Sequence, residues 1–378
     1  MNSMTKINTL IIGAGPAGLA VAGRLRHQKL PFEIVEQTDK VGWAWHNHYD
    51  RLHLHTVKQL SALPHLPFPE SYPLYVPRAK VVEYLETYTT FFNIEPHFNT
   101  SIIKLENKKT YWVAQTKTDK VFHAENVVIA TGVNRVPNVP TWQGQKAFKG
   151  TIIHSRDYKN PQPFKGKKVL IIGMGNTGAE LAFDLSEHNV ETTIAVRNPI
   201  SVVPRDLNGQ PVQLTAKKLA KLPFGLGDWL GSKIRRVYMG DLSKYGIPLS
   251  TMSPTVQLRE TGKTPVIDIG TVKAIKEGKI KVIRNVDQFF ENGIVSSGEK
   301  LAFDSVILAT GYRAKIEDFV ANIGAFLDKY GCPKGCIGTD DLQNLYFVGF
   351  DNYKTGGILG TIAADSETVV NAIAQSTP

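Results

Sequence analysis

The stretch that decides the fold is Phe148–Gly178, FKGTIIHSRDYKNPQPFKGKKVLIIGMGNTG. In its second half a short apolar segment, Lys168–Ile172, runs directly into the glycine-rich loop Gly173–Gly178. Short apolar runs of this kind are typical of central strands in parallel sheets. A Gly-x-Gly-x-x-Gly loop between strand and helix allows a tight turn, close approach of a pyrophosphate and close helix–strand packing. The stretch therefore predicts a dinucleotide-binding unit whose helix continues to about His188.

The same pattern occurs at the beginning of the chain. Ile7–Ile12 predicts a buried strand, Gly13–Gly18 a second loop of this kind, and Leu19–His27 an amphipathic helix. The next expected strand, Phe32–Val35, ends in Glu36. An acidic residue at this position can bind the hydroxyls of a ribose. Two dinucleotide sites in one chain indicate a flavoprotein that takes electrons from a nicotinamide.

The residue that ends the corresponding strand of the second unit is basic. Glu191–Val196 predicts that strand, and Arg197 follows it. An arginine can pair with a 2′-phosphate, whereas an acid would repel it, so the sequence favours NADPH over NADH. The alternative is that Arg197 is a solvated charge and that another residue sets the preference.

Two segments that end in Ala-Thr-Gly, Asn126–Gly132 and Asp304–Gly311, lie on either side of the second glycine loop. Their similarity suggests a first domain that is interrupted and then resumed. The connector Val133–Phe164 is rich in prolines, which suits a crossing between domains. We therefore predict an α/β fold with two Rossmann-like dinucleotide-binding domains of the three-layer ββα type, the second inserted in the first.

The expected FAD-binding domain comprises residues 1–157 and 298–378, and the expected NADPH-binding domain comprises 158–297. A helical insertion is expected at about 202–262, where LPFGLGDWLGSKIRRVYMG combines apolar and basic residues. This insertion either packs on the second domain or rests on a membrane surface or another subunit. A final helix, from about Gly356 to Ile373, begins in glycines and is placed to direct its N-terminal dipole at a flavin.

An aromatic excursion, Val41–Arg78, separates the first dinucleotide unit from the rest of the chain. It is rich in Trp, His, Tyr and Pro, and its prolines exclude a long regular element. Irregular segments of this length in compact domains are usually functional.

Composition limits the class of protein. An apolar content of 42% with 21% charged residues is that of an ordinary globular protein, and we expect no signal peptide or membrane span. The net charge of +10 is scattered, which suits phosphorylated cofactors, an acidic substrate or simple solubility rather than nucleic acid. Cys332 and Cys336 are interpreted as loop thiols in a reducing cytoplasm, and no metal site is expected. A homodimer is left open.

The first half of the opening stretch carries a family resemblance. Phe148-x-Gly150-x-x-x-His154-x-x-x-Tyr158 matches the motif that precedes the NADPH loop in flavin-containing monooxygenases. The chain resembles more closely the plant YUCCA-type indole-3-pyruvate monooxygenases and their bacterial relatives, over nearly its whole length. The similar stretches are Tyr49–Pro69, Gly262–Gly270, Gly278–Ile283 and Asp304–Arg313.

The resemblance implies a class B flavoprotein monooxygenase that uses FAD, NADPH and O2. In that family NADPH reduces FAD, and the reduced flavin captures O2 as a C4a-(hydro)peroxyflavin that oxygenates a small organic substrate. A 2-oxo acid such as indole-3-pyruvate, which loses CO2, is favoured over a nucleophilic amine or sulfide. The alternatives are a flavin reductase or diaphorase without oxygen transfer, and a flavin-bound sensor without turnover.

The resemblance also implies roles for single residues. Glu36 would hold the FAD ribose, and Trp45 would line the flavin site. His55 stands where many animal-type members have asparagine, and it would either exchange a proton with the reacting groups or fix its loop. His154 would order the connector and sense NADPH, with a part in catalysis as the alternative, and Asn134 would contact the nicotinamide amide.

Arg51 or Arg78 of the aromatic excursion could pair with a substrate carboxylate. The candidate catalytic residues are His55, Asn134 and His154. The candidate cofactor-binding residues are Gly13, Gly15, Pro16, Ala17, Gly18, Glu36, Trp45, His55, Thr131, Gly132, Gly173, Gly175, Asn176, Thr177, Gly178, Arg197, Gly311 and Gly349.

Overall fold

The computed structural model describes residues 6–219, 225–351, 353 and 356–376. The chain divides into two compact units. Unit 1 contains the residues up to Asn47, Thr56–Val136 and the residues from Tyr312 on, and unit 2 contains His48–His55 and Pro137–Gly311. The second unit is thus inserted in the first, and one short piece of the early chain packs with it.

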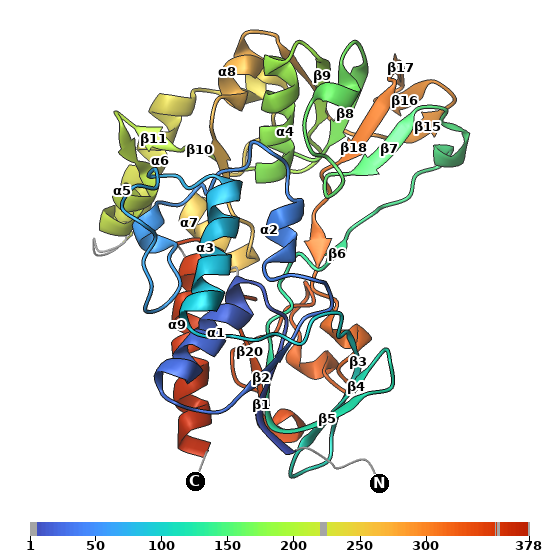
Figure 1. The fold of residues 1–378 in the computed structure, drawn as a ribbon. Helices are drawn as coiled ribbons and strands as arrows, with labels where there is room; N and C mark the ends of the chain where they lie inside the picture. The colour runs from blue at the N-terminus through green and yellow to red at the C-terminus, as the bar shows by residue number, and fades with distance from the viewer. Residues whose placement is uncertain (1–5, 220–224, 352, 354–355, 377–378) are drawn as a thin grey trace. The chain divides into compact units, whose positions relative to one another are not determined.

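Unit 1 is built on a six-stranded sheet (Figure 1). Five of its strands follow the order β2-β1-β5-β4-β3, and the sixth, β20, pairs with β5 outside this order. β1 pairs in parallel with β2 on one side and with β5 on the other. β5 is long enough to have two further neighbours, since its last residues pair in parallel with β20 and its first residues pair antiparallel with β4. The strands are β1 (Lys6–Ile12), β2 (Glu33–Val35), β3 (Ile102–Asn107), β4 (Trp112–Thr116), β5 (Val121–Ile129) and β20 (Leu345–Phe347).

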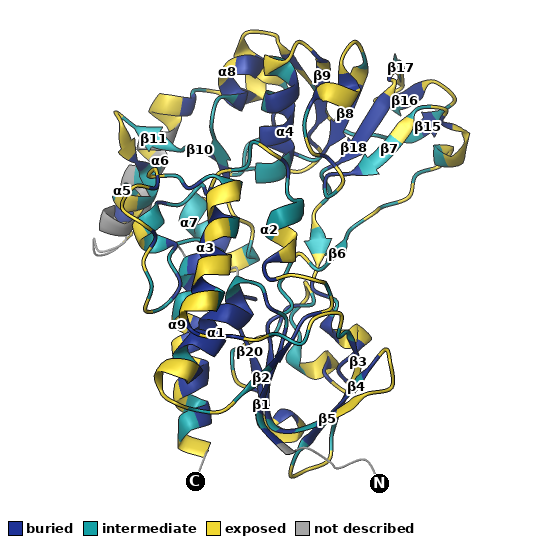
Figure 2. Ribbon diagram, in the orientation of Figure 1, coloured by how far each residue is buried: buried dark blue, intermediate teal, exposed yellow. Residues whose placement is uncertain are grey.

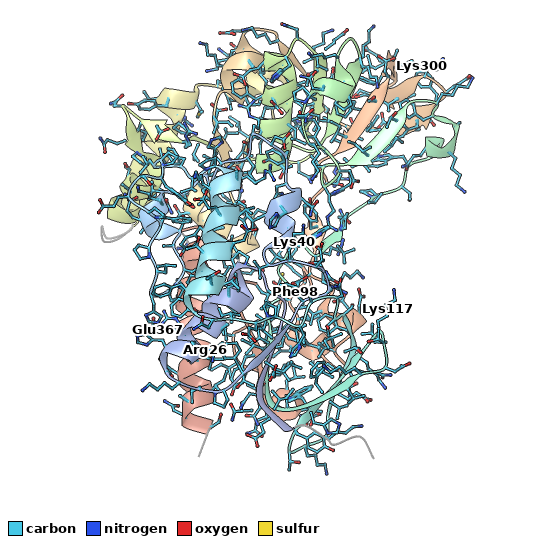
Figure 3. The ribbon with its side chains drawn as sticks, in the orientation of Figure 1. Arg26, Lys40, Phe98, Lys117, Lys300 and Glu367 are labelled. Atoms are coloured by element: carbon cyan, nitrogen blue, oxygen red, sulfur yellow. The ribbon has the colours of Figure 1, made fainter. Side chains whose placement is uncertain are left out.

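Helices α1 (Pro16–His27) and α9 (Ile358–Ser376) pack against each other in this unit, and α3 (Arg78–Phe91) packs on α1. Arg26 on α1 and Glu367 on α9 mark the exposed sides of these two helices (Figure 3). The short helix α2 (Trp43–Asn47) contacts α3. The expected final helix is present, with its first residue at Ile358.

Unit 2 has three layers around a five-stranded, wholly parallel sheet, β14-β9-β8-β18-β7. The strands of this sheet are β7 (Thr151–His154), β8 (Lys168–Ile172), β9 (Glu191–Ala195), β14 (Ile280–Ile283) and β18 (Ser305–Leu308). Central strands β8, β9 and β18 are almost entirely buried (Figure 2). This burial explains the apolar residues Val169–Ile172 of β8 and Val306–Leu308 of β18, whereas β9 also buries Thr192 and Thr193.

Alternate side chains of β8 build two separate cores. Val169 and Ile171 pack with helix α4 (Asn176–Glu187) and helix α8 (Thr271–Lys276). Leu170 and Ile172 pack with an antiparallel meander on the opposite face. The meander consists of β15 (Gln288–Phe290), β16 (Gly293–Ser296) and β17 (Glu299–Ala302). These layers confirm the expected ββα type.

The described residues of the segment 202–262 include three α-helices and three short strands of unit 2. They are β10 (Val202–Pro204), β11 (Asp206–Leu207), β12 (Gln210–Pro211), α5 (Val212–Leu219), α6 (Leu226–Met239) and α7 (Pro254–Thr261). β10 pairs with β13 (Val266–Asp268). The expected helical patch at 222–240 lies partly outside the described residues. None of the helices in the described part combines the length and apolar content needed to cross a membrane.

The chain passes from unit 1 to unit 2 within β6 (Val136–Pro137) and returns at β19 (Tyr312–Arg313). The sequence suggested crossings at about 157/158 and 297/298. The observed crossings enclose a longer segment because β7 is an edge strand of the unit 2 sheet, paired with β18 from Thr151 to His154. The connector therefore belongs to the inserted unit.

Candidate functional site

The two outer glycines of the first loop are required by the fold itself. Gly13 has φ +107°, and a Cβ there would lie 2.7 Å from the carbonyl oxygen of Ala130. A Cβ on Gly18 would overlap the carbonyl oxygen of Gly13. Both positions therefore exclude any larger residue.

The middle glycine is different. Gly15 has an ordinary extended backbone, with φ −81° and ψ −174°, and a Cβ there would meet no atom within 4 Å. Gly15 caps α1, and Pro16 and Ala17 form the first turn of that helix. The fold would accept a side chain at Gly15, so the glycine leaves open space in front of a helix N-terminus. This is the arrangement that binds a pyrophosphate.

Glu36 follows β2 and is 8% exposed. One carboxylate oxygen accepts from the backbone N–H of Ala14 at 2.9 Å. The other accepts from the backbone N–H and the hydroxyl of Thr38 at 3.0 and 2.9 Å. Because an ionised carboxylate offers about four acceptor sites, Glu36 can hold the glycine loop and still accept from a ribose hydroxyl.

The other candidates in unit 1 surround the same loop or lie near its sheet. Gly349 has φ +83°, and a Cβ there would contact Ala17 at 3.2 Å. Thr131, just after β5, has a buried hydroxyl with no hydrogen-bond partner in the described structure, and Gly132 follows with φ +77°. Two candidates remain outside this group: Trp45 is half-buried in α2, and Asn134 is exposed.

The second loop repeats the geometry of the first. Gly173 also has φ +107°, and a Cβ there would lie 2.5 Å from the carbonyl oxygen of Ala309. A Cβ on Gly178 would overlap the carbonyl oxygen of Gly173, whereas a Cβ on Gly175 would meet nothing within 4 Å. The two loops have the same spacing of glycines in the sequence and the same constraints in the structure. We infer that they bind the same kind of group.

The first turn of α4 begins with Asn176 and Thr177. The side chain of Asn176 is held by the β13 region, since its Oδ1 accepts from the Ile267 N–H at 2.7 Å and its Nδ2 donates to Pro265 at 3.3 Å. Arg197, after β9, is exposed and has no hydrogen bond or ion pair within the described residues. Its guanidinium is therefore available to an anion.

The opening motif forms the edge of unit 2. A Cβ on Gly150 would overlap both the Phe148 ring and the carbonyl oxygen of Asp304. Phe148 packs edge-on against Phe289 of the meander, with ring centroids 5.6 Å apart. The spacing Phe-x-Gly is thus explained by an aromatic ring that folds over a position where only glycine fits.

His154, at the end of β7, has both ring nitrogens in use. Its Nδ1 accepts from the Arg156 N–H at 3.1 Å, so its Nε2 carries the proton and donates to the Gly311 carbonyl at 3.1 Å. Burial lowers the pKa of His154, although the bond to Gly311 acts in the opposite direction. A neutral, fully hydrogen-bonded ring supports the interpretation that His154 orders the connector.

Sequence reasoning missed a cluster of buried carboxylates on α4. Glu180 and Asp184 are 2% and 4% exposed, and both accept hydrogen bonds from the segment His48–His55 or from Tyr158. We call them and their donors the α4 cluster: Glu180, Asp184, Tyr49, Arg51, His55 and Tyr158. The spacing of four residues on one helix was the available signal, but such a pair usually indicates a solvated face.

One of the donors corrects an expectation. Arg51 pairs with Asp184 at 3.2 Å and with Glu187 at 2.7 Å. Burial opposes its charge, but the hydrogen bond to Glu187 and the charge of Asp184 raise the pKa of the guanidinium above its ordinary value. Since two carboxylates of the protein already hold Arg51, the structure does not support it as the receptor for a substrate carboxylate.

Comparison with known proteins identifies the family. The family model described as flavin-binding monooxygenase-like matches residues 6–323. The chain belongs to this family. It is 36% identical to the probable indole-3-pyruvate monooxygenase YUCCA7 of Arabidopsis thaliana over 97% of this chain and 87% of that protein. It is 34% identical to the indole-3-pyruvate monooxygenase YUCCA1 of Oryza sativa over 93% of this chain and 88% of that one.

A solved flavin-containing monooxygenase from Stenotrophomonas maltophilia superposes with a TM-score of 0.76 at 20% identity, covering 99% of this chain and all of that one. This likeness confirms the two-domain fold. Family membership makes the protein a flavin-dependent monooxygenase, as the sequence predicts, and the reductase alternative is not supported.

The residues present fit the flavin that the family name implies. The protein's own contacts leave three features available to a ligand. They are the open space at Gly15, the carboxylate of Glu36 and the unpartnered hydroxyl of Thr131. No group of three metal-binding side chains occurs in the described part of this flavin monooxygenase. In unit 1, Ala17 and Gly349 come close together and Glu36 holds the glycine loop, while Trp45 and Asn134 lie outside this group; unit 2 adds the α4 cluster around His55.

Proposed function

We propose that the protein is an FAD- and NADPH-dependent monooxygenase that converts a 2-oxo acid, such as indole-3-pyruvate, into the acid one carbon shorter. The observation that carries the proposal is 36% identity, over 97% of this chain, to a protein named for that reaction. The balanced reaction consumes the 2-oxo acid, O2, NADPH and a proton, and it yields the shortened acid, CO2, water and NADP+. The flavin supplies the oxygen activation.

Unit 1 binds FAD in this proposal. The backbone N–H groups at the start of α1 face the pyrophosphate, and the absence of a side chain on Gly15 lets it approach. Glu36 accepts from the ribose, and the Thr131 hydroxyl offers a donor or acceptor near the end of β5. Trp45 supplies an aromatic surface for the flavin.

Unit 2 binds NADPH. The start of α4 and the space at Gly175 receive the pyrophosphate, and the exposed Arg197 pairs with the 2′-phosphate. Asn134 of unit 1 keeps its proposed role at the nicotinamide amide. Since Arg51 is held by protein carboxylates, we keep Arg78 as the candidate for the substrate carboxylate; it lies in the first turn of α3, and its Nη1 donates to the His46 carbonyl at 2.8 Å.

His55 handles a proton in this proposal. Its Nε2 is held by Glu180, so the proton is taken up or released at Nδ1. The reaction takes place in the cytoplasm, and the two free thiols, Cys332 and Cys336, suit such a reducing compartment.

Product analysis tests the function. The FAD-loaded protein is incubated with NADPH and, separately, indole-3-pyruvate, phenylpyruvate, a tertiary amine and a thioether under ¹⁸O2. We expect the shortened acid with one labelled oxygen. Catalase is present in every reaction, because hydrogen peroxide alone decarboxylates 2-oxo acids. If only N-oxide or S-oxide forms, or if catalase removes the acid product, the 2-oxo acid assignment is wrong.

A further inference from the structure

Glu180 is a carboxylate that unit 2 buries at some cost. It lies in the second turn of α4, just after the glycine loop, and is 2% exposed. A buried carboxylate is expensive unless it is paired and hydrogen-bonded. The hydrogen-bond partners of Glu180 therefore indicate what this buried carboxylate does in the protein.

Both recorded partners donate to the same oxygen. The Tyr49 hydroxyl donates to Oε2 at 2.7 Å, and His55 Nε2 donates to Oε2 at 3.1 Å. Since an ionised carboxylate only accepts, Nε2 must carry the proton of the neutral ring. The second nitrogen, Nδ1, is then left without a proton and can accept one.

We propose that Glu180 is the positioning residue of His55: it fixes the ring orientation and the Nε2–H tautomer, so that Nδ1 is the atom that exchanges a proton during the reaction. This inference rests on the proposed function of His55. An orienting carboxylate of this kind is how other enzymes hold a reacting histidine in one tautomer.

The surrounding charges are consistent with this role. Arg51 interacts electrostatically with Glu180, but its guanidinium donates its hydrogen bonds to Asp184 and Glu187. The Glu180 carboxylate is therefore shared between the Tyr49 hydroxyl and the His55 ring. Asp184, one turn later on the same helix, accepts from Tyr158 at 2.7 Å and does not contact His55. It is the matched control.

The first measurement is ¹⁵N NMR of the histidine rings in the FAD-loaded protein, with the signal of His55 assigned by its absence in His55→Leu. We expect the Nε2–H tautomer in the wild type, a mixture of tautomers in Glu180→Leu, and an unchanged signal in Asp184→Asn. An Nδ1–H ring in the wild type, or an unchanged tautomer in Glu180→Leu, overturns the inference.

The second measurement is a double-mutant cycle on kcat. Glu180→Leu should lower kcat by about 10- to 100-fold, taking as a guide the range for loss of the carboxylate partner of a metal-ligating histidine. In the His55→Leu background the same change should cost nothing further, because its effect passes through His55. The KM for NADPH should stay unchanged in Glu180→Leu. A raised KM would indicate that the substitution has distorted α4, whose first turn binds NADPH in our proposal.

If the losses in kcat of Glu180→Leu and His55→Leu multiply in the double variant, the two residues act independently and the inference is wrong. Should Glu180→Leu fail to fold, Glu180→Gln takes its place. One carboxylate oxygen then becomes an NH2 donor, so the amide can present either a donor or an acceptor to the ring, and we expect the tautomer signal to become mixed. If the wild type makes no oxygenated product, the proposed function fails. The NMR result, and the cycle measured on NADPH oxidation, then still decide the role of Glu180.

Discussion

The middle glycine of the NADPH loop allows the fold and the ligand to be tested separately. Gly175 has backbone angles that alanine adopts without strain, and a Cβ there would meet no protein atom within 4 Å. We therefore expect Gly175→Ala to fold normally and to bind NADPH weakly. The added methyl group would occupy the space in which the pyrophosphate approaches the start of α4.

Two small effects on stability oppose each other. Alanine restricts the unfolded chain, which stabilises by about 0.4–1 kcal/mol. Alanine is also a poorer helix cap than glycine, which costs roughly 0.5–1 kcal/mol. The net change in the free energy of unfolding should therefore stay within about 1 kcal/mol. Loss of one charge-assisted hydrogen bond to phosphate costs about 1.5–3 kcal/mol, or roughly 10- to 100-fold in Kd.

The assay compares thermal unfolding of the ligand-free protein with calorimetric titration of NADP+. Gly178→Ala is the control, because its Cβ would overlap the Gly173 carbonyl oxygen, and the fold must shift to admit it. That control should lower Tm, by roughly 2–4 °C for each kcal/mol lost. If Gly175→Ala lowers Tm while Kd for NADP+ stays constant, the open space at Gly175 is not the phosphate site.

Three further changes test other parts of unit 2. Arg197→Glu should raise KM for NADPH far more than KM for NADH, because an acid repels the 2′-phosphate, and equal effects would contradict the assignment. Tyr158→Phe removes a donor from buried Asp184 and should lower the free energy of unfolding by about 1–3 kcal/mol; an unchanged urea midpoint would contradict this. Because burial lowers the pKa of His154 from 6.5, its contribution to stability should be present above that pH and disappear as the pH falls through the lower folded-state value. The Tm difference between wild type and His154→Gln should therefore shrink in mildly acidic buffer, and a constant difference would refute the assignment.

Both glycine loops could be predicted from the sequence because their physics is local. The clash that excludes a side chain at Gly18 comes from Gly13 of the same loop, and the positive φ of Gly13 belongs to the turn itself. The ring of Phe148 lies over Gly150, two residues away. The carbonyl oxygens of Ala130 and Asp304, which also approach Gly13 and Gly150, are the part that the sequence does not reveal. Wherever the constraint lies within one strand–loop–helix unit, spacing is enough to reveal it.

The α4 cluster could not be predicted because its partners are far apart in the chain. His55 and Glu180 are separated by 125 residues, and Tyr49 and Glu180 by 131. From sequence, Glu180 and Asp184 look like the solvated side of an amphipathic helix. Only the folded chain shows that His48–His55 packs with unit 2 and turns that side inward.

The domain crossings were misplaced for a related reason. A proline-rich connector is typical of a boundary, but such a pattern does not say to which side each residue belongs. Thr151–His154 pairs with β18, whose sequence lies about 150 residues later, and this pairing assigns the connector to unit 2. Long-range strand pairing decides membership in a domain, and it leaves little trace in a single sequence.

The composition of the α4 cluster argues that it serves orientation more than stability. Two like charges one helical turn apart repel each other, and each must be removed from water. A pair of apolar residues at Glu180 and Asp184 would stabilise the helix packing at least as well, since replacing buried ionic groups with apolar ones is often neutral or stabilising. What apolar residues cannot do is fix the rotation and the tautomer of an imidazole. In our proposal α4 therefore has two tasks: its first turn binds the phosphates of NADPH, and its second turn holds the ring of His55 in one tautomer.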